Sequence, residues 1–397
     1  MTSSASDSGE AVRGSLVQPV SAGLLAAVVG FASSFTIVLA GYAAVGASPA
    51  EAASGLMAVS LAMGLSAVLS LRTRMPIAIA WSTPGAALLV ATGAPAGGFP
   101  VAVGAFLVTA ALIVAAGVVK PFGRAVAAIP MPLAGAMLAG VLLDLCLAPM
   151  RAVGAMPALA LPIVLTWALA LRFARLWAVP IATVVTAAII VMATPLPDGA
   201  LADVWPKPVL VAPVFTLDAV IGIAIPLFIV TMASQNVPGL AVLRANGYRP
   251  DVPPIFVATG LVSAMTAPFG GHTVNLAAIT AALCAGPEAH PDPARRWIAG
   301  VAAGCAYGVI AVLAPAAAAF IAASPPLLIQ AVAGLALLGS LAGALSTALA
   351  REEDRVPAIL TFVTTASGLS FFGIGAAFWG LVAGGLVMLL LRVGRPT

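Results

Sequence analysis

The chain has 397 residues, of which 62% are hydrophobic and 8% are charged, and its formal net charge is +4. Soluble domains carry about 25% charged residues, so this composition excludes a soluble globular protein. It predicts a polytopic membrane protein whose surroundings are the lipid bilayer. The net charge indicates no nucleic-acid partner, because basic residues in membrane proteins mainly set the orientation of the spans.

The chain begins with a polar segment of mixed charge, residues 1–15. This segment lacks a charged region followed by an apolar stretch and a cleavage site, so we expect a retained cytoplasmic tail, not a signal peptide. The three cysteines, Cys146, Cys284 and Cys305, have neither paired nor metal-ligand spacing. No disulfide, metal site or other cofactor is therefore predicted.

Basic residues fall in tight clusters that predict the topology. Fifteen of the 17 lysines and arginines form eight clusters, which leave seven apolar intervals between them. Most of these intervals have room for two crossings and a turn. If all clusters are cytoplasmic, as the positive-inside rule favours, the chain has 14 spans and both termini are cytoplasmic. The clusters are Arg13; Arg72 and Arg74; Lys120 and Arg124; Arg172 and Arg175; Arg244 and Arg249; Arg295 and Arg296; Arg351 and Arg355; Arg392 and Arg395.

Fourteen spans divide into two halves of seven, and an odd number of spans inverts the second half relative to the first. The predicted fold class is therefore an all-α polytopic membrane protein with 14 transmembrane segments in two inverted seven-span repeats. The predicted boundaries are a first repeat over 16–194, an extracytoplasmic connection over 195–214, a second repeat over 215–391 and a cytoplasmic C-terminus over 392–397.

Proline and glycine interrupt the third span of the first half, in "MPIAIAWSTPGAALLVATG". An extended-looking alternation runs through Trp81, after which Ser82 or Thr83 is suited to cap a helix and Pro84 to begin it. The sequence thus predicts a half-helix in span 3, which starts near mid-membrane after a short extended stretch.

The corresponding span of the second half, span 10, contains "PFGGHTVNLAAITAAL". Here a broken lead-in precedes a polar cap at His272 or Thr273 and a predicted half-helix over 274–283. Paired broken segments at matching positions of two repeats indicate the substrate site of a transporter. Two half-helix N-termini, each with unpaired N–H groups and about half a positive charge, suit an anion.

Three polar residues of span 10 are candidates for this site. His272 is either a structural imidazole satisfied by a backbone carbonyl or a proton carrier, since histidine titrates near neutrality and ionisable groups within spans mark ion or substrate paths. Thr273 and Asn275 either line the site or serve as caps and helix–helix contacts. From span 3, Ser82, Thr83 and Gly85 are predicted to bind the substrate.

Span 8 contains a polar run in "TMASQNVPGL", where Ser234, Gln235 and Asn236 precede a proline and a glycine. These side chains either hold helices together or bind a carboxylate or carbonyl. Binding is favoured, because this span is expected to pack against the broken helix of its own half.

Two acidic residues and one aromatic residue complete the candidates. Asp144 and Asp218 both lie near the outer face in the predicted topology, as solvated helix ends or as proton-coupling groups. Phe35 in the first span either packs against neighbours or contacts an aromatic substrate.

No enzyme is predicted. The sequence has no H-E-x-x-H, no G-x-S-x-G and no Walker-type phosphate loop, so neither these hydrolytic reactions nor ATP hydrolysis is indicated. A secondary active transporter remains.

Three stretches carry a family resemblance: "GLLAAVVGFASSFTIVLAGYAAVGASPAEAASGL", "AWSTPGAALL" and "PFGGHTVNLAAITAALCAGPEAHPDPARRW". They resemble the benzoate/proton symporter family, BenE, over about residues 16 to 392. That family is similar in turn to the seven-plus-seven inverted-repeat group of uracil permeases and sulfate transporters. The resemblance implies a core domain, spans 1–4 and 8–11, which moves like an elevator against a gate domain, spans 5–7 and 12–14, often within a homodimer.

The resemblance also implies a substrate. His272 stands where nucleobase permeases carry a substrate-binding glutamate, and their second glutamate falls near Ser234. The absence of both acids argues against a nucleobase and agrees with benzoate or a related aromatic carboxylate. By this resemblance the protein imports benzoate with a proton across a bacterial inner membrane, and His272 takes up the proton or pairs with the anion. Two alternatives remain: transport or exchange of another anion or nucleobase-like substrate, and a non-transporting membrane receptor or scaffold.

Overall fold

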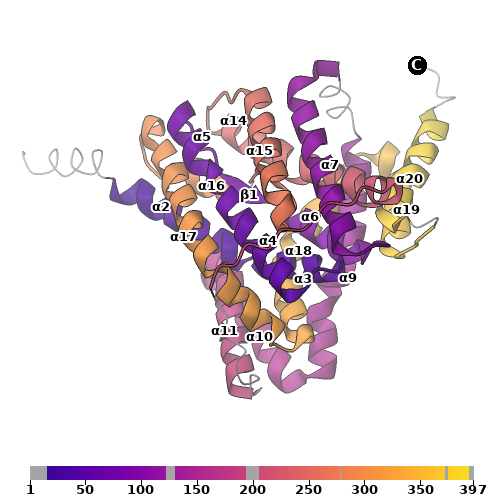
Figure 1. Cartoon of the computed structure of the whole chain (residues 1–397), viewed down its shortest axis with the longest axis horizontal. Coiled ribbons are helices and arrows are strands. Elements are labelled where there is room, and N and C mark those ends of the chain that lie inside the picture. Colours follow the sequence, from indigo (N-terminus) through magenta and orange to yellow (C-terminus); the bar gives the residue numbers. More distant parts are fainter. Residues whose placement is uncertain (1–15, 122–129, 194–204, 278, 372–373, 393–397) are drawn as a thin grey trace, which may run out of the picture.

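The computed structural model describes residues 16–121, 130–193, 205–277, 279–371 and 374–392, and these residues are almost entirely helical (Figure 1). Within these ranges nine helical runs are long and apolar enough to cross a membrane, and three shorter apolar helices accompany them. The chain is therefore a mostly helical polytopic membrane protein, as predicted. The predicted tail over 1–15, residues 393–397 and half of the predicted connection lie outside the described residues.

The described residues of the first half contain one short strand among their helices. Two apolar runs of this half each consist of two consecutive helices: α2 and α3 form one run, and α4 and α5 form the other. Its elements are α2 (Val17–Ala32), α3 (Phe35–Ala44), α4 (Pro49–Ala62), α5 (Leu65–Thr73), β1 (Ile79–Trp81), α6 (Thr83–Thr92), α7 (Phe99–Val118), α9 (Met131–Ala155), α10 (Pro157–Phe173), η1 (Arg175–Trp177) and α11 (Ala178–Ala193).

In the second half, too, the part of the chain that the structure describes contains one short strand. In its first apolar run two π-helical turns, η2 and η3, separate the α-helical pieces, and such turns are frequent at functional sites. Its elements are α12 (Leu217–Ala219), η2 (Val220–Ala224), α13 (Ile225–Thr231), η3 (Met232–Asn236), α14 (Val237–Ala245), α15 (Val252–Thr266), η4 (Ala267–Phe269), β2 (Val274–Leu276), α16 (Ile279–Ala285), η5 (Pro293–Arg295), α17 (Trp297–Ala322), α18 (Pro326–Ala348), η6 (Glu352–Asp354), α19 (Arg355–Ala366) and α20 (Ala376–Arg392).

The two strands pair with each other. β1 and β2 are antiparallel, with Ile79 opposite Leu276 and Trp81 opposite Val274. This pairing brings together two segments about 195 residues apart and satisfies their backbone groups inside the protein, as a membrane interior requires. The strand before α6 confirms the extended stretch predicted there.

The predicted cap of α6 at Ser82 is confirmed. Ser82 is the N-cap, and its side-chain oxygen accepts from the Gly85 N–H at 3.1 Å. Thr83 is the first helical residue and Pro84 the second, so the helix begins one residue earlier than predicted.

The predicted start of the second short helix is wrong. The residues expected in its first turn, Val274–Leu276, form β2 instead, and α16 begins at Ile279. Neither His272 nor Thr273 therefore caps this helix. The reason is tertiary: β2 bonds to β1, and its last N–H donates to the Asn236 side chain at 3.0 Å. These distant partners hold the backbone extended, and local capping signals do not report them.

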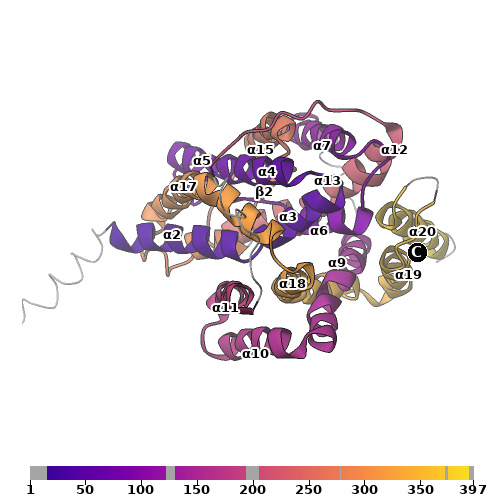
Figure 2. The same ribbon diagram turned by 60° about the horizontal axis from the view of Figure 1, so that its bottom comes forward.

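The helices pack in two groups, which Figures 1 and 2 show from two directions. In the first group α17 packs on α2, α4 and α5, α7 packs on α15, and α3 packs on α6. In the second group α18 packs along α9, α19 packs on α9 and α20, and α10 packs on α11. A Cβ added at Gly334 of α18 would clash with the Leu145 carbonyl oxygen, so glycine permits the close approach of α9 and α18. The groups meet where α6 contacts α9 and α3 contacts α18.

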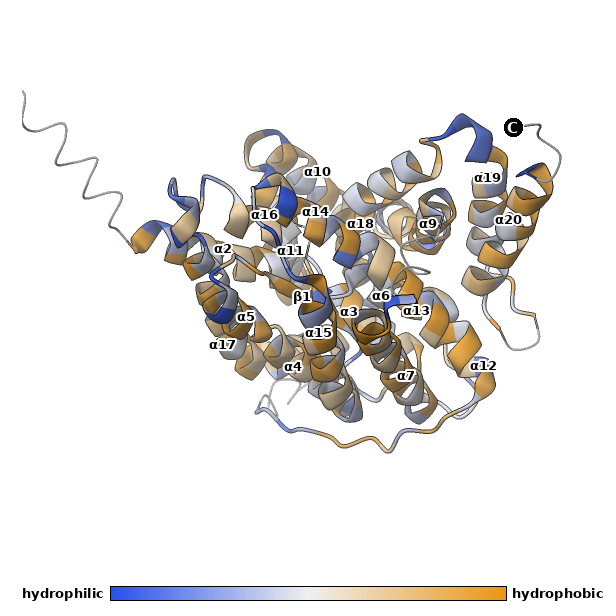
Figure 3. Cartoon of the chain, turned by 90° about the horizontal axis from the view of Figure 1, so that it is seen from above, coloured by the Kyte–Doolittle hydropathy of each residue, from blue (hydrophilic) through white to orange (hydrophobic). Residues whose placement is uncertain are grey.

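The outer surface is apolar. Large hydrophobic side chains such as Leu165, Val184 and Met192 are exposed, and Figure 3 shows apolar residues along the helices with a hydrophilic segment just before α19. An exposed surface of this kind fits contact with lipid. The segment over 205–216 crosses α4 and α7 in extended form, where the N–H of Val209 donates to Ser54 and that of Val214 to the Pro100 carbonyl.

Candidate substrate site

Hydrogen bonds tie the start of α6 to the lead-in of α16. The Ser82 N–H donates to the Thr273 carbonyl oxygen at 3.0 Å. From α13, the Thr231 hydroxyl donates to Ser82 Oγ at 3.0 Å and lies 3.4 Å from Thr273 Oγ1. All three residues are fully buried. Three segments that are far apart in the sequence are thus joined at one point.

His272 extends this junction to α3. Its Nδ1 lies 2.8 Å from the Tyr42 hydroxyl oxygen and its Nε2 lies 3.2 Å from the Ser82 carbonyl oxygen. Because a carbonyl only accepts, Nε2 carries the proton of the neutral ring. The Tyr42 oxygen accepts from the His272 backbone N–H at 3.3 Å, so its own O–H donates to Nδ1. The buried imidazole is therefore fully satisfied in its neutral form.

Two buried amides support the strand β2. In the orientation that satisfies both of its atoms, the Asn275 amide accepts from the Ser82 N–H at 3.1 Å and donates to the Leu276 carbonyl oxygen at 2.9 Å. Asn236 accepts from the Leu276 N–H at 3.0 Å, and its Nδ2 donates to the sulfur of Met232. Both side chains connect segments of the protein and leave no part of the amide exposed.

A cavity of about 410 Å³, the α6 cavity, lies between the two helix groups at the start of α6. Its first wall includes Pro84 of α6 and Ser234 and Gln235 of η3, and its second wall comes from α9 and α18, where Ser340 and Thr347 are polar. The Ser234 hydroxyl donates to a backbone carbonyl, whereas the Gln235 amide has no hydrogen-bond partner among the described residues. Gln235 therefore presents free donors and an acceptor to a ligand.

The predicted binding residues take three different positions. Ser234 and Gln235 line the α6 cavity, and Thr83 is half-buried next to Pro84, which lines it. Phe35 stacks on Phe31, with ring centroids 5.0 Å apart. The remaining six are buried behind the cavity wall: Ser82, Gly85, Asn236, His272, Thr273 and Asn275. The structure thus brings most predicted residues together, as one junction and one adjoining cavity.

The two predicted acidic residues lie elsewhere. Asp144 is exposed on α9 and forms an ion pair with Arg151 at 2.7 Å. Asp218 is exposed in the first turn of α12, which Thr216 caps. Neither residue lines the α6 cavity.

Sequence reasoning missed four residues of this region. Tyr42 was not predicted as a partner of His272, and Thr231 was not singled out beside the polar run that follows it. Ser340 and Thr347 were also missed, although their seven-residue spacing puts two polar side chains on one face of an otherwise apolar helix. That periodicity was the available signal for the second wall of the cavity.

A profile of the BenE family, described as benzoate membrane transport protein, matches residues 15–390. The chain belongs to the BenE family. Among its relatives, the inner membrane protein YdcO of Escherichia coli is 43% identical over 376 residues, which are 94% of this chain and 95% of that protein. The benzoate membrane transport protein of Acinetobacter baylyi is 33% identical over 376 residues, 93% of this chain and 94% of that protein. This BenE member is accordingly a membrane transporter.

Solved structures share the fold of this BenE chain. The transmembrane domain of a cyanobacterial bicarbonate transporter, BicA, matches with a TM-score of 0.56 at 17% identity, over 95% of this chain and 98% of that one. The murine anion transporter Solute Carrier 26 family member A9, in an inward-facing state, matches with a TM-score of 0.62 at 15% identity, over 96% of this chain and 69% of that one. At these identities the likeness is one of fold.

Proposed function

We propose that the protein imports benzoate, or a related aromatic carboxylate, together with a proton. The observation that carries this proposal is the α6 cavity, which combines apolar walls with a few neutral polar groups next to the start of a short helix. Its volume of about 410 Å³ falls within the range of small-molecule sites. Membership of the BenE family and the name of the Acinetobacter relative support the same substrate class.

The carboxylate binds at the Gln235 end of the cavity. At the start of α6 few backbone donors remain, because the N–H groups of Ser82 and Gly85 already donate within the protein and Pro84 has none. The Thr83 N–H, supported by the helix dipole, and the Gln235 amide are then the donors available to an anion. The buried junction behind them holds this geometry and does not itself touch the substrate.

The aromatic ring packs on the apolar part of the same cavity. Pro84 and Val230 provide one side, and Leu138 and Ala336 of the second helix group provide the other. A ring clamped between the two groups is released when they slide past one another. This arrangement supports an elevator-type movement of a core domain, spans 1–4 and 8–11, against a gate domain, spans 5–7 and 12–14.

The coupled proton is carried by His272. Protonation of Nδ1 reverses its hydrogen bond with Tyr42, because the ring then donates to the hydroxyl oxygen and the hydroxyl proton must find another acceptor. Since the same ring contacts Ser82, the change reaches the start of α6. One proton with one carboxylate makes the transport electroneutral. Asp144 and Asp218 are the competing proton sites.

The architecture that we propose contains 14 spans in two inverted repeats, over 16–194 and 215–391. The two short helices, α6 and α16, are half-spans at matching positions, each preceded by a strand. Both termini are cytoplasmic, in a bacterial inner membrane, and the protein acts as a homodimer. The positive-inside rule supports this orientation, as most of the basic clusters then lie on one side.

Uptake of labelled benzoate into liposomes that contain the purified protein tests this function. Because uncharged benzoic acid crosses bilayers unaided, the initial rate is corrected with protein-free liposomes, and saturation is required. Competition with salicylate, bicarbonate, sulfate and uracil tests the alternative substrates. We expect salicylate to compete and uracil, bicarbonate and sulfate not to compete. Absence of saturable, protein-dependent uptake would favour a receptor or scaffold.

A further inference from the structure

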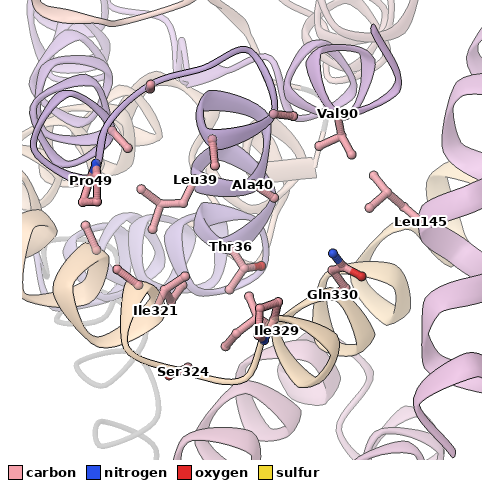
Figure 4. Close-up of a pocket in the computed structure, with 17 residues that line it drawn as sticks. Thr36, Leu39, Ala40, Pro49, Val90, Leu145, Ile321, Ser324, Ile329 and Gln330 are labelled. Atoms are coloured by element: carbon pink, nitrogen blue, oxygen red, sulfur yellow. The ribbon is translucent and has the colours of Figure 1, made fainter. Parts of the chain in front are cut away.

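A second and larger cavity lies between the two helix groups. This cavity, the α3 cavity, has a volume of about 490 Å³ and is bounded by α3, the end of α17 and the start of α18 (Figure 4). Val90 of α6 and Leu145 of α9 close its far side. Its lining is predominantly apolar and, among the described residues, contains no charged side chain.

The two cavities lie in line along the same helices. On α6, Pro84 lines the α6 cavity and Val90 lines the α3 cavity. On α18, Ala336 lines the α6 cavity and Gln330 lines the α3 cavity. These two residues are six positions apart, which corresponds to about 9 Å along a helix. Leu142 of α9 and Ala333 of α18 fall between the lining residues of the two cavities along their helices, and both are almost completely buried. An apolar partition therefore separates two chambers that lie at different levels along the interface between the groups.

Two neutral polar side chains enter the α3 cavity from opposite walls. Thr36 comes from α3 and Gln330 from α18, and Figure 4 shows both directed into the cavity. Thr36 is only 3% exposed, and within the described part of the chain neither side chain has a hydrogen-bond partner. The third polar residue, Ser324, differs because its hydroxyl already donates to the Phe320 carbonyl. Gln330 is exposed, whereas Thr36 is almost completely buried and its hydroxyl has no protein partner among the described residues. A hydroxyl and an amide that are both free on facing walls suit a ligand with hydrogen-bonding groups of its own.

The chemistry of these two groups selects the protonation state of the ligand. A primary amide presents an acceptor and a donor side by side, which match the O–H and the C=O of an uncharged carboxylic acid. A carboxylate has no proton for the amide oxygen, and among the described residues no cation lines the cavity to pair with its charge. The apolar side chains of Leu39, Val90, Leu145 and Ile329 then suit an aromatic ring.

We propose that the α3 cavity is a second binding site, which takes the aromatic acid in its protonated, uncharged form. Gln330 pairs with the carboxylic acid group, Thr36 adds a third hydrogen bond, and the ring lies against the apolar walls. In the topology proposed above this chamber faces the outside, so acid and proton enter together. The site rests on the proposed transport of an aromatic acid, and it adds a binding step ahead of the α6 cavity. On passing to the α6 cavity the acid gives up its O–H proton to Nδ1 of His272 and binds there as the carboxylate.

Equilibrium binding of labelled benzoate to the protein in lipid nanodiscs tests this site. The wild type is expected to bind two equivalents per chain at about pH 5 and to lose one of them as the pH rises. The apparent Kd of that second site should rise about tenfold per pH unit above the carboxyl pKa of about 4.3, because the protonated fraction falls by that factor.

Two matched substitutions distinguish binding in the α3 cavity from binding in the α6 cavity. Gln330→Leu should abolish the pH-dependent equivalent and raise the KM for uptake at about pH 5 several-fold, with kcat near the wild-type value. Gln235→Leu makes the same change on the wall of the α6 cavity and should keep the pH-dependent equivalent. Thermal unfolding of both variants shows whether they fold, and Thr36→Val provides a second, milder test of the α3 cavity.

The outcomes are distinguishable. If the wild type transports benzoate but binds one equivalent at every pH, the second site is wrong and the proposed function stands. The second site is also wrong if Gln330→Leu keeps both equivalents, or if a lipid chain occupies the cavity and excludes benzoate. If the wild type neither binds nor transports benzoate, both proposals are wrong.

Discussion

The Nδ1 atom of His272 lies 2.8 Å from the hydroxyl oxygen of Tyr42, a residue 230 positions earlier in the chain. The same hydroxyl accepts from the His272 backbone N–H, and the other ring nitrogen reaches the Ser82 carbonyl oxygen. One tyrosine of α3 thus holds the lead-in of α16 and, through the imidazole, the start of α6. A change in the protonation of this ring alters the contacts of both short helices.

Removing the Tyr42 hydroxyl should damage this junction. Tyr42→Phe leaves the Nδ1 and the backbone N–H of His272 buried without a partner, which costs about 1–3 kcal/mol. We expect a lower unfolding temperature and a slower initial rate of benzoate uptake per folded protein. Tyr307→Phe is the matched control, because Tyr307 is equally buried and its hydroxyl makes one long contact of 3.5 Å. Wild-type uptake and stability of Tyr42→Phe would contradict the account.

The proton assignment is tested by His272→Gln. Glutamine keeps hydrogen-bonding capacity but does not titrate, so uptake should lose its stimulation by an inward proton gradient. His290→Gln is the control, since His290 is the only other histidine and lies in the connection between α16 and α17. Gradient-stimulated uptake by His272→Gln at the wild-type level would exclude His272 as the proton carrier.

Two helix caps of the same type allow structure and function to be separated. Ser82→Ala removes the cap of α6 and Ser48→Ala removes the cap of α4, and each should cost about 1 kcal/mol of stability. Only Ser82→Ala should also reduce uptake per folded protein, because Ser82 Oγ is bonded to Thr231 inside the junction. Uptake assays normalised to folded protein, with thermal unfolding in parallel, measure both effects. An equal loss of uptake in the two variants would show that capping alone matters.

Gln235 and Asn236 are neighbours with different predicted roles. Gln235→Leu removes free donors from the α6 cavity and should raise the KM several-fold with little effect on stability. Asn236→Leu removes the acceptor of the Leu276 N–H in β2, leaves that group buried and unsatisfied, and should destabilise the protein by about 1–3 kcal/mol. Titration of uptake rate against benzoate concentration and thermal unfolding distinguish them. A reversed pattern would move the binding role to Asn236.

Neutralising the exposed acidic residues tests the competing proton sites. Asp144→Asn breaks an exposed ion pair with Arg151, and such pairs contribute about 0–1 kcal/mol. Asp218→Asn changes an exposed helix start. Both variants should retain proton-stimulated uptake. Loss of that stimulation in either one, with intact folding, would transfer the coupling role from His272.

Local signals predicted the first short helix well and the second poorly. A cap followed by proline defines the start of α6, because Ser82 and Gly85 are three residues apart and interact directly. The start of α16 depends instead on β1 and on Asn236, which are far away in the sequence. Capping patterns therefore predicted correctly that Ser82 is the N-cap of α6. They also predicted His272 or Thr273 as the N-cap of the second short helix, and the structure contradicts this.

The polar residues of the candidate site show the same limit. Their types indicated an intramembrane site, but not which of them are exposed to a cavity. His272, Thr273 and Asn236 are fully buried because each finds protein partners across the junction, whereas Gln235 finds none among the described residues and faces the α6 cavity. Which polar group stays free is decided by tertiary packing, and a single sequence does not contain that information.

The most direct test of the central claim is the initial rate of labelled benzoate uptake into proteoliposomes at about neutral pH, with and without an inward proton gradient. The rate in protein-free liposomes is subtracted, because passive entry of benzoic acid responds to the same gradient. The account predicts a saturable, protein-dependent rate that the inward proton gradient increases. A protein-dependent rate that does not change with the proton gradient would contradict proton symport.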